Sequence, residues 1–278
     1  MAKDYYVLEN GVKIPMIASG TYKAEVIRAA IDVGYRCFDT ASYYGTEPDL
    51  AEAIRGSGIP REEFFITSKL WKDEMGYDNA KAAFSRTLER LETDYLDLYL
   101  IHWPLPEPGY KDWKALDMET WKALEDLYDE GKIRAIGLSN FLPHHVENIL
   151  AGCRVKPMVD QLEFHPGYSQ EAAVRYCQER NILVQAWSPL GRQRVFEEPL
   201  ILSLAEKYHV SSAQICLRFA VQRGIMPLPK ASSAERMKEN LDVFSFVIEE
   251  EDMYRLETMP QTGWSGEHPD RERVRLNS

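Results

Sequence analysis

The sequence has few of the features that mark secreted, membrane-spanning or metal-binding proteins. Its 278 residues include only four cysteines, and no two of these have the spacing of a metal or redox motif. No apolar run approaches the length of a bilayer span, and residues 1–10 lack the continuous apolar core of a signal peptide. We therefore expect a cytoplasmic protein in which Cys37, Cys177 and Cys216, which lie in apolar runs, are buried thiols.

The chain also lacks an excess of positive charge. Its 33 basic residues are outnumbered by 44 acidic ones, which gives a net charge of −11. This charge disfavours non-specific binding to nucleic acid or to an anionic membrane, because both are themselves negative. An anionic cofactor stays possible, since local basic groups decide whether such a molecule binds.

Two further absences concern the fold. No stretch rich in proline, glycine or serine divides the chain, so we expect one domain over residues 1–278. The glycine-rich G-x-G-x-x-G turn of an open dinucleotide-binding sheet is also missing. Both observations favour a closed sheet over an open, doubly wound one.

Short apolar segments typical of strands alternate with amphipathic segments typical of helices along most of the chain. A hairpin is expected to turn at Asn10-Gly11, because Asn-Gly is a strong hairpin signal. The later strand candidates are residues 17–20, 36–39, 64–67, 96–101, 133–138, 158–163, 182–187 and 225–228. Their spacing of about thirty residues is the size of one strand–helix unit. The pattern predicts an α/β fold, a (β/α)8 TIM barrel with an N-terminal β-hairpin.

Start and stop signals delimit the helices between these strands. Asp78 and Ser169 are expected to open two of them, and Ser211 a third. Residues 118–128 form an amphipathic pattern that a glycine terminates. Beyond Pro260 no periodicity remains, so we expect a C-terminal loop that folds over the active-site mouth.

Chemically active side chains follow three consecutive strand candidates. Asp39 ends one strand and Tyr44 lies in the loop after it, while Lys69 and His102 follow the next two strands. The carboxyl ends of barrel strands converge on one mouth, so these four residues should meet there. A lysine in such a place is costly to desolvate without a carboxylate, and Asp39 is the natural partner.

The four side chains make chemical sense together. A neighbouring ammonium stabilises a phenolate, so Lys69 would help Tyr44 to give a proton to a developing alkoxide. Asp39 would hold Lys69 in place, and His102 would orient the substrate oxygen. Taken singly, Asp39 and Lys69 could be a structural ion pair and His102 a core histidine; three consecutive strand ends on one face favour the catalytic interpretation.

Residues 39–45, 66–71 and 100–104 resemble the three catalytic segments of the aldo-keto reductases. The resemblance runs over nearly the whole chain, and it is strongest to prokaryotic members such as diketogulonate and glyoxal reductases. It implies reduction of aldehydes or ketones, among them small dicarbonyls and keto sugars, to alcohols by hydride transfer from NADPH. Tyr44 is then the general acid, Lys69 and Asp39 tune it, and His102 orients the carbonyl.

The resemblance also implies a nicotinamide site. Ser139, Asn140 and Gln161 would bond the carboxamide, and Trp187 offers a flat indole to stack on the ring. The implied cofactor-binding residues are Ser139, Asn140, Gln161, Trp187, Ser188, Leu190, Lys230, Ser232, Arg236, Glu239 and Asn240. In the alternative interpretation, Trp187 only fills the barrel mouth and Ser139-Asn140 caps the next helix.

Lys230 and Arg236 bracket a helix start with hydroxyls between them, which suits a phosphate. In the family this segment grips the adenosine 2′-phosphate, so the resemblance favours NADPH over NADH; the alternative is a solvated basic helix start. Ala231 departs from the family pattern, because a serine often follows the lysine there, and one phosphate ligand is thereby lost.

For the substrate, we expect an aromatic pocket suited to small carbonyl compounds. Its candidate residues are Tyr22, Trp71, Trp103 and Trp264, although aromatics of this kind also pack in cores. The expected partner is a small carbonyl substrate, with a monomeric chain and neither nucleic acid nor membrane.

Two rival functions belong to other classes. One is a binding or regulatory subunit that keeps the barrel without useful turnover; intact Tyr44 and its neighbours speak against it. The other is a metal-dependent lyase or hydrolase, for which His102 and His165 would be ligands. The adjacent His144-His145 pair follows Pro143 at a helix start, and we expect it to be solvated, with no metal bound.

Overall fold

The computed structural model describes residues 5–21 and 26–275, and within them eight parallel strands form the predicted ring. The strands are β3 (Ser19–Gly20), β4 (Cys37–Asp39), β5 (Phe65–Leu70), β6 (Leu98–Ile101), β7 (Ile136–Ser139), β8 (Val159–Glu163), β9 (Leu183–Trp187) and β10 (Met226–Pro227). They pair in sequence order from β3 to β10. Backbone hydrogen bonds from Ala18 N to Pro227 O (3.3 Å) and from Gly20 N to Pro229 O (3.2 Å) join the first strand to the last, so the barrel closes. Each strand lies within or beside its predicted segment.

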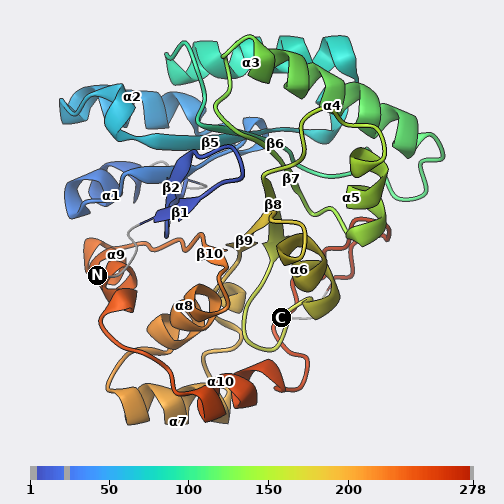
Figure 1. The fold of residues 1–278 in the computed structure, drawn as a ribbon. Coiled ribbons are helices and arrows are strands. Elements are labelled where there is room, and N and C mark those ends of the chain that lie inside the picture. Colours follow the sequence, from blue (N-terminus) through green and yellow to red (C-terminus); the bar gives the residue numbers. More distant parts are fainter. Residues whose placement is uncertain (1–4, 22–25, 276–278) are drawn as a thin grey trace.

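Helices surround the ring (Figure 1). They are α1 (Ile27–Val33), α2 (Glu47–Ser57), α3 (Tyr77–Leu91), α4 (Trp113–Asp129), α5 (Pro143–Leu150), α6 (Glu171–Gln178), α7 (Pro199–Tyr208), α8 (Ser212–Gln222), α9 (Ala234–Leu241) and α10 (Glu250–Glu257). Ser211 caps α8 as predicted, since its side chain accepts a hydrogen bond from Gln214 N. Two predicted caps are wrong. Gly76, not Asp78, precedes α3, and Gln170, not Ser169, precedes α6.

Side chains along each strand alternate between the barrel interior and the helix layer, as a period of two requires. On β6, Leu98 and Leu100 belong to the interior cluster, whereas Tyr99 and Ile101 pack in the outer one. Leu8 and Ile14 of the N-terminal hairpin join the interior cluster.

That hairpin, formed by β1 (Tyr5–Val7) and β2 (Lys13–Pro15), therefore plugs one end of the barrel with apolar side chains. Figure 1 shows it in front of the strands. A reaction site is therefore expected at the opposite end of the barrel, where the strands terminate.

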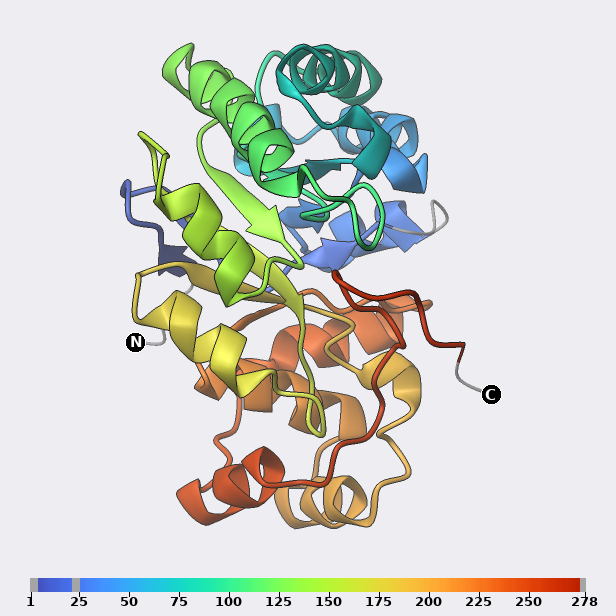
Figure 2. The ribbon, with the colours of Figure 1, turned by 90° about the vertical axis from the view of Figure 1, so that its right-hand side faces the viewer.

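The chain after α10 contains neither helix nor strand in its described residues, and in Figure 2 it runs as a red trace toward the centre of the ring. No helix in the described ranges is long and apolar enough to cross a bilayer. Cys37, Cys177 and Cys216 are buried and unpaired, as the sequence predicts.

Candidate active site

Three neighbouring strands place Asp39, Lys69 and His102 at one end of the barrel. The alternation that turns Cys37, Phe65 and Leu100 inward also turns these three residues inward. Asp39 and His102 lie one period further along their strands, and Lys69 lies two periods past Phe65. All three are buried, and Lys69 is fully inaccessible. The sequence-based prediction that they converge at the carboxyl ends of the strands agrees with their positions.

The charge of Lys69 is neutralised within the barrel. Its Nζ donates to Asp39 Oδ1 at 2.6 Å and to the carbonyl oxygen of Thr40 at 2.9 Å. Burial lowers the pKa of Lys69, but Asp39 and Tyr44 act against it, and the pKa is raised on balance. Lys69 is therefore a charged ammonium at neutral pH.

Tyr44 lies beside this ammonium. It ends the short helix η2 (Ser42–Tyr44), and Gly45 closes that turn in the left-handed region (φ 69°), which favours glycine. Lys69 Nζ lies 5.0 Å from the centroid of the Tyr44 ring, and a side-chain hydrogen bond between the two contributes to the raised pKa of Lys69. The ring of His102 meets Tyr44 edge-on, with 5.8 Å between centroids.

His102 is electrically neutral at this site. Burial, and then the charges of Lys69 and Lys72, hold its pKa well below the usual range. Its Nδ1 is buried and has no hydrogen-bond partner within the described part of the chain. A neutral imidazole in contact with the phenol can offer one N–H and one acceptor to a bound molecule.

The residues predicted to hold the nicotinamide form one hydrogen-bonded group. Asn140 Nδ2 donates to the carbonyl oxygen of His102 (3.0 Å) and to Ser139 Oγ (3.2 Å), and Ser139 Oγ donates to Gln161 O (3.1 Å). Gln161 Nε2 donates to Asp39 Oδ2 at 2.8 Å, which connects this group to the carboxylate that pairs with Lys69. Trp187 Nε1 donates to Asn140 Oδ1 at 2.8 Å, which fixes the indole.

The alternative role of Asn140 as a helix cap is wrong. Leu142 occupies the N-cap position of α5, and Asn140 instead adopts a left-handed backbone (φ 63°), a conformation that asparagine tolerates. Ser188, after Trp187, is left-handed as well (φ 47°). Leu190 follows in the same loop, half-buried.

The basic segment after β10 lies at the start of α9, where Ser233 caps the helix by accepting from Arg236 N. Lys230, Ser232, Arg236 and Glu239 are exposed there. Asn240 differs from its neighbours, because it is buried and its side chain hydrogen-bonds Tyr35.

The aromatic residues predicted to line a pocket occupy different places. Trp71 stacks on Tyr43 (3.9 Å between centroids) and meets His102 edge-on (4.9 Å). Trp103 and Trp187 line a hollow that residues 267–269 close. Trp264 lies farther along the C-terminal segment, stacked on Tyr168 (6.2 Å). Tyr22 lies outside the described residues.

Specific contacts hold the C-terminal segment against the mouth. The buried Glu163, at the end of β8, accepts from Ser265 N (2.9 Å) and Ser265 Oγ (2.7 Å). Arg194 donates to the carbonyl oxygen of Trp264 at 2.7 Å. The predicted loop over the mouth is thus present, anchored to loops that follow β8 and β9.

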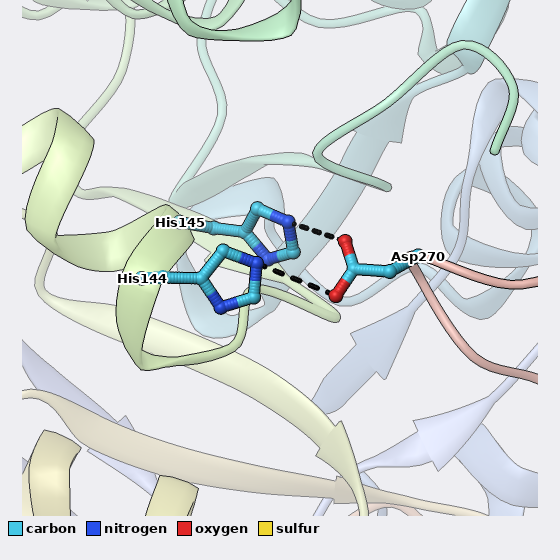
Figure 3. A group of neighbouring side chains, drawn as sticks. All are labelled: His144, His145 and Asp270. Carbon is cyan, nitrogen blue, oxygen red and sulfur yellow. Dashed lines mark ion pairs between the residues drawn. The ribbon is translucent and has the colours of Figure 1, made fainter. Parts of the chain in front are cut away.

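A third anchor corrects the prediction that His144 and His145 are solvated (Figure 3). His144 is half exposed, but the side chain of His145 is completely buried. Their Nε2 atoms lie 3.3 and 2.9 Å from the two oxygens of Asp270, on the C-terminal segment. Trp113 of α4 covers His145 edge-on at 4.9 Å, which the local sequence pattern does not reveal.

This trio is a group of potential metal ligands, with ligand atoms within 4.8 Å of one another. The backbone of α5 argues against that use. Leu142 N donates to His145 Nδ1 at 3.1 Å, so a neutral His145 carries its proton on Nε2, the atom that faces Asp270. A metal at Nε2 would need that proton on Nδ1, against an N–H donor. The geometry fits a structural contact in which His144 and His145 of α5 hold Asp270 of the C-terminal segment.

Sequence reasoning missed Lys72, Glu163 and Asp270. Lys72 directly follows the motif that ends in Trp71, and it faces Trp103 with 4.8 Å between Nζ and the ring centroid. Its position in the motif could have drawn attention to it. Glu163 and Asp270 gain their roles from partners about a hundred residues away along the chain, which no local pattern reveals.

The comparisons with known proteins identify the family. A model of the Aldo/keto reductase family matches residues 18–260. The glyoxal reductase of Bacillus subtilis (strain 168) is 43% identical over 96% of this chain and 97% of its own length. The uncharacterized oxidoreductase YtbE of the same organism is also 43% identical, over 95% of both chains. The crystal structure of MGS-M4, an aldo-keto reductase enzyme from a Medee basin deep-sea metagenome library, matches with a TM-score of 0.90 and 34% identity, over 97% of this chain and 100% of that one.

Proposed function

Because this chain belongs to the aldo/keto reductase family, we propose that it reduces small aldehydes and ketones to alcohols with NADPH. Small dicarbonyl compounds are the first substrates to consider, since a relative with 43% identity is a glyoxal reductase. The observation that carries the proposal is the phenol of Tyr44 beside the charged, buried Lys69.

In the proposed reaction, Tyr44 gives its proton to the oxygen that becomes the alcohol. The interaction with Lys69 is mutual, so the ammonium that is stabilised by the phenol also stabilises the phenolate left behind. Asp39, 2.6 Å from Lys69 Nζ, keeps the ammonium charged and aimed. His102, held neutral, bonds the carbonyl oxygen and orients it toward Tyr44.

The residues at the mouth fit a nicotinamide. When bound, the dihydronicotinamide supplies the hydride that reduces the carbonyl carbon. Gln161 uses both amide hydrogens within the protein, on Asp39 and on Gln185, which leaves its Oε1 to accept from a carboxamide. Trp187, fixed by Asn140, offers its indole face for stacking, and the unpartnered Nδ1 of His102 gives a further polar group.

The preference for NADPH rests on the start of α9. Lys230, Ser232 and Arg236 are exposed around the cap that Ser233 forms, where the first-turn N–H groups and two cations suit a phosphate. Ala231 supplies no hydroxyl, so we expect fewer protein groups to bind the 2′-phosphate of NADPH than the family pattern provides, and NADPH still to be preferred over NADH. A single domain over residues 1–278, a monomeric state and a cytoplasmic location stay predictions from sequence.

The test is oxidation of NADPH and NADH with a panel of small aldehydes, dicarbonyls and keto sugars. We expect turnover with at least one dicarbonyl, faster with NADPH. Replacing Tyr44 by phenylalanine should lower kcat by about a thousandfold or more, because it removes the proton donor while keeping the ring.

The neighbouring phenol gives a matched control. Tyr43 is 59% exposed and stacks on Trp71, and a Tyr43→Phe variant keeps that stack while removing the same hydroxyl. We expect it to stay within a few-fold of the parent enzyme. Unchanged turnover in Tyr44→Phe would refute the acid role, and no turnover in the parent enzyme would favour a binding subunit.

A further inference from the structure

Lys72 is a cation at the barrel mouth that the proposed reaction does not use. It begins the short helix η4 (Lys72–Glu74), directly after Trp71. Its Nζ lies 4.8 Å from the centroid of the Trp103 ring and 5.7 Å from that of Trp71. The ammonium therefore rests against two indoles, one after β5 and one after β6.

These indoles adjoin the catalytic histidine. Trp71 meets His102 edge-on at 4.9 Å, and Trp103 follows His102 in the chain. The charge of Lys72 is near enough to contribute to the lowered pKa of His102. A substrate whose carbonyl oxygen reaches His102 can therefore extend its other atoms along the indoles toward Lys72.

Lys72 is only partly compensated by the protein. It is half-buried, and no carboxylate of the described residues comes within 4.0 Å of its Nζ. Burial lowers its pKa, and Glu267 and Glu272 of the C-terminal segment offset this in part from a distance. Lys69, by contrast, holds its carboxylate at 2.6 Å. A half-desolvated ammonium without a close counter-ion gains from an incoming anion.

The surroundings add positive charge at the rim. Arg194, Arg273 and Arg275 line a concavity of about 500 Å³, together with Ser265, Glu272 and Val274. Arg273 pairs with Glu267 at 3.0 Å, so the three arginines exceed Glu267 and Glu272 by a single charge. Arg194 and Ser265 there belong to the contacts that anchor the C-terminal segment at the mouth. A cationic rim raises the local concentration of anionic substrates even on a chain of net charge −11.

We propose that Lys72 determines specificity by binding the carboxylate of an oxo acid, so that the enzyme favours carbonyl substrates with a negative charge away from the reacting carbon. The inference rests on the proposed function, because Tyr44 and His102 fix where the carbonyl lies. Lys72 transfers no proton and touches only the substrate's far end. Lys72 is a binding residue, so we expect its replacement to change KM and not kcat.

The first experiment compares 4-oxobutanoate with its methyl ester, which differ in charge and little in chain length. Changing Lys72 to methionine keeps the aliphatic contact with the indoles and removes the charge. We expect KM for the acid to rise about tenfold, with kcat for both substrates and KM for the ester nearly unchanged. Lys72→Arg should restore most of the preference for the acid.

Lys122 gives a matched control. It is exposed on α4, and its Nζ lies over the ring of Tyr77 at 5.8 Å, so Lys122→Met makes the same change in net charge and in a cation–π contact. We expect no change in the ratio of the two KM values. An unchanged ratio in Lys72→Met, or equal losses on both substrates, would overturn the proposal.

A binding measurement separates this proposal from the proposed function. Titration of indole fluorescence with 4-oxobutanoate and with the ester requires no turnover, and Trp71 and Trp103 report on the site. We expect saturable binding of the acid to be at least about fivefold weaker in Lys72→Met. Equal binding by both proteins would refute the role of Lys72, whether or not the enzyme reduces either compound.

Discussion

The mouth of the barrel is built from two regions of opposite construction. The corner proposed to be catalytic, Asp39, Lys69 and His102, stands at the ends of adjacent strands and is buried, with its charges paired at 2.6 Å. The C-terminal segment, residues 261–275, has no regular structure, and its residues 271–275 are exposed. A few side-chain contacts hold it, chiefly those of Glu163 and His145.

This difference teaches where each property of the enzyme resides. A sheet fixes the positions of side chains through its own backbone hydrogen bonds, so the atoms proposed to react are placed as precisely as the core. Loops tolerate change, because few backbone groups depend on them. We therefore expect changes in the corner to abolish turnover and changes in the segment to alter KM.

Lys69→Met tests the corner and should have the largest effect. It leaves Asp39 buried without its cation, which costs about 3–5 kcal/mol of stability, and it should remove nearly all turnover. Urea unfolding and NADPH oxidation would measure both.

A surface pair gives the contrast. Lys81 pairs with Glu130 at 3.0 Å on the outer helices, and Lys81→Met should change neither stability nor turnover appreciably. The double change Asp39→Asn with Lys69→Met should recover much of the lost stability but none of the turnover. Full activity in Lys69→Met would remove the distinction between the two regions.

The corner was also the part that sequence could predict. Short apolar segments about thirty residues apart located the eight strands. The polar residues that follow the apolar run of a strand, such as Lys69 and His102, were expected to meet at one mouth. The contacts of the C-terminal segment could not be predicted from such a pattern. The burial of His145 depends on Trp113 and Asp270, and the side chain of His144 beside it is half exposed.

Helix caps failed for a related reason. Asp78 is a good cap by residue type, yet it lies in the first turn of α3, after Gly76. A hydrogen bond from Gly76 N to Thr120 Oγ1 (2.8 Å) ties that start to α4, so a tertiary contact and not local preference decided where the helix begins.

Ser265→Ala tests the segment and should have an intermediate effect. It removes the 2.7 Å bond to the buried Glu163, which is worth about 1.5–3 kcal/mol for a hydrogen bond to a charged group. Tm should fall by several degrees, trypsin should cut faster at Arg271 and Arg273, and KM should rise while kcat stays nearly constant. Ser203→Ala, an exposed serine on α7, is the control. If Ser265→Ala lost as much kcat as Lys69→Met, the C-terminal segment would contribute to catalysis as the corner does, and the distinction between the two regions would be wrong.

The smallest expected effect concerns pH and separates the buried His145 from its half-exposed neighbour, His144. Burial lowers the pKa of His145 from 6.5 to about 4, although Asp270 acts against this. Between these values the unfolded chain binds more protons than the folded one, so stability is complete above pH 6.5 and declines as pH falls toward 4.

From pH 7 to 5.5 this one group should cost about 1 kcal/mol. His145→Asn keeps an acceptor for Leu142 N and removes the titration, so the decline in Tm over this range should become shallower than in the parent protein. His144→Asn, at the half-exposed neighbour, should leave the decline unchanged. If the decline in Tm with pH is the same in His145→Asn as in the parent protein, the contact between His145 and Asp270 opens before His145 is protonated. The C-terminal segment would then be held more loosely than its contacts indicate.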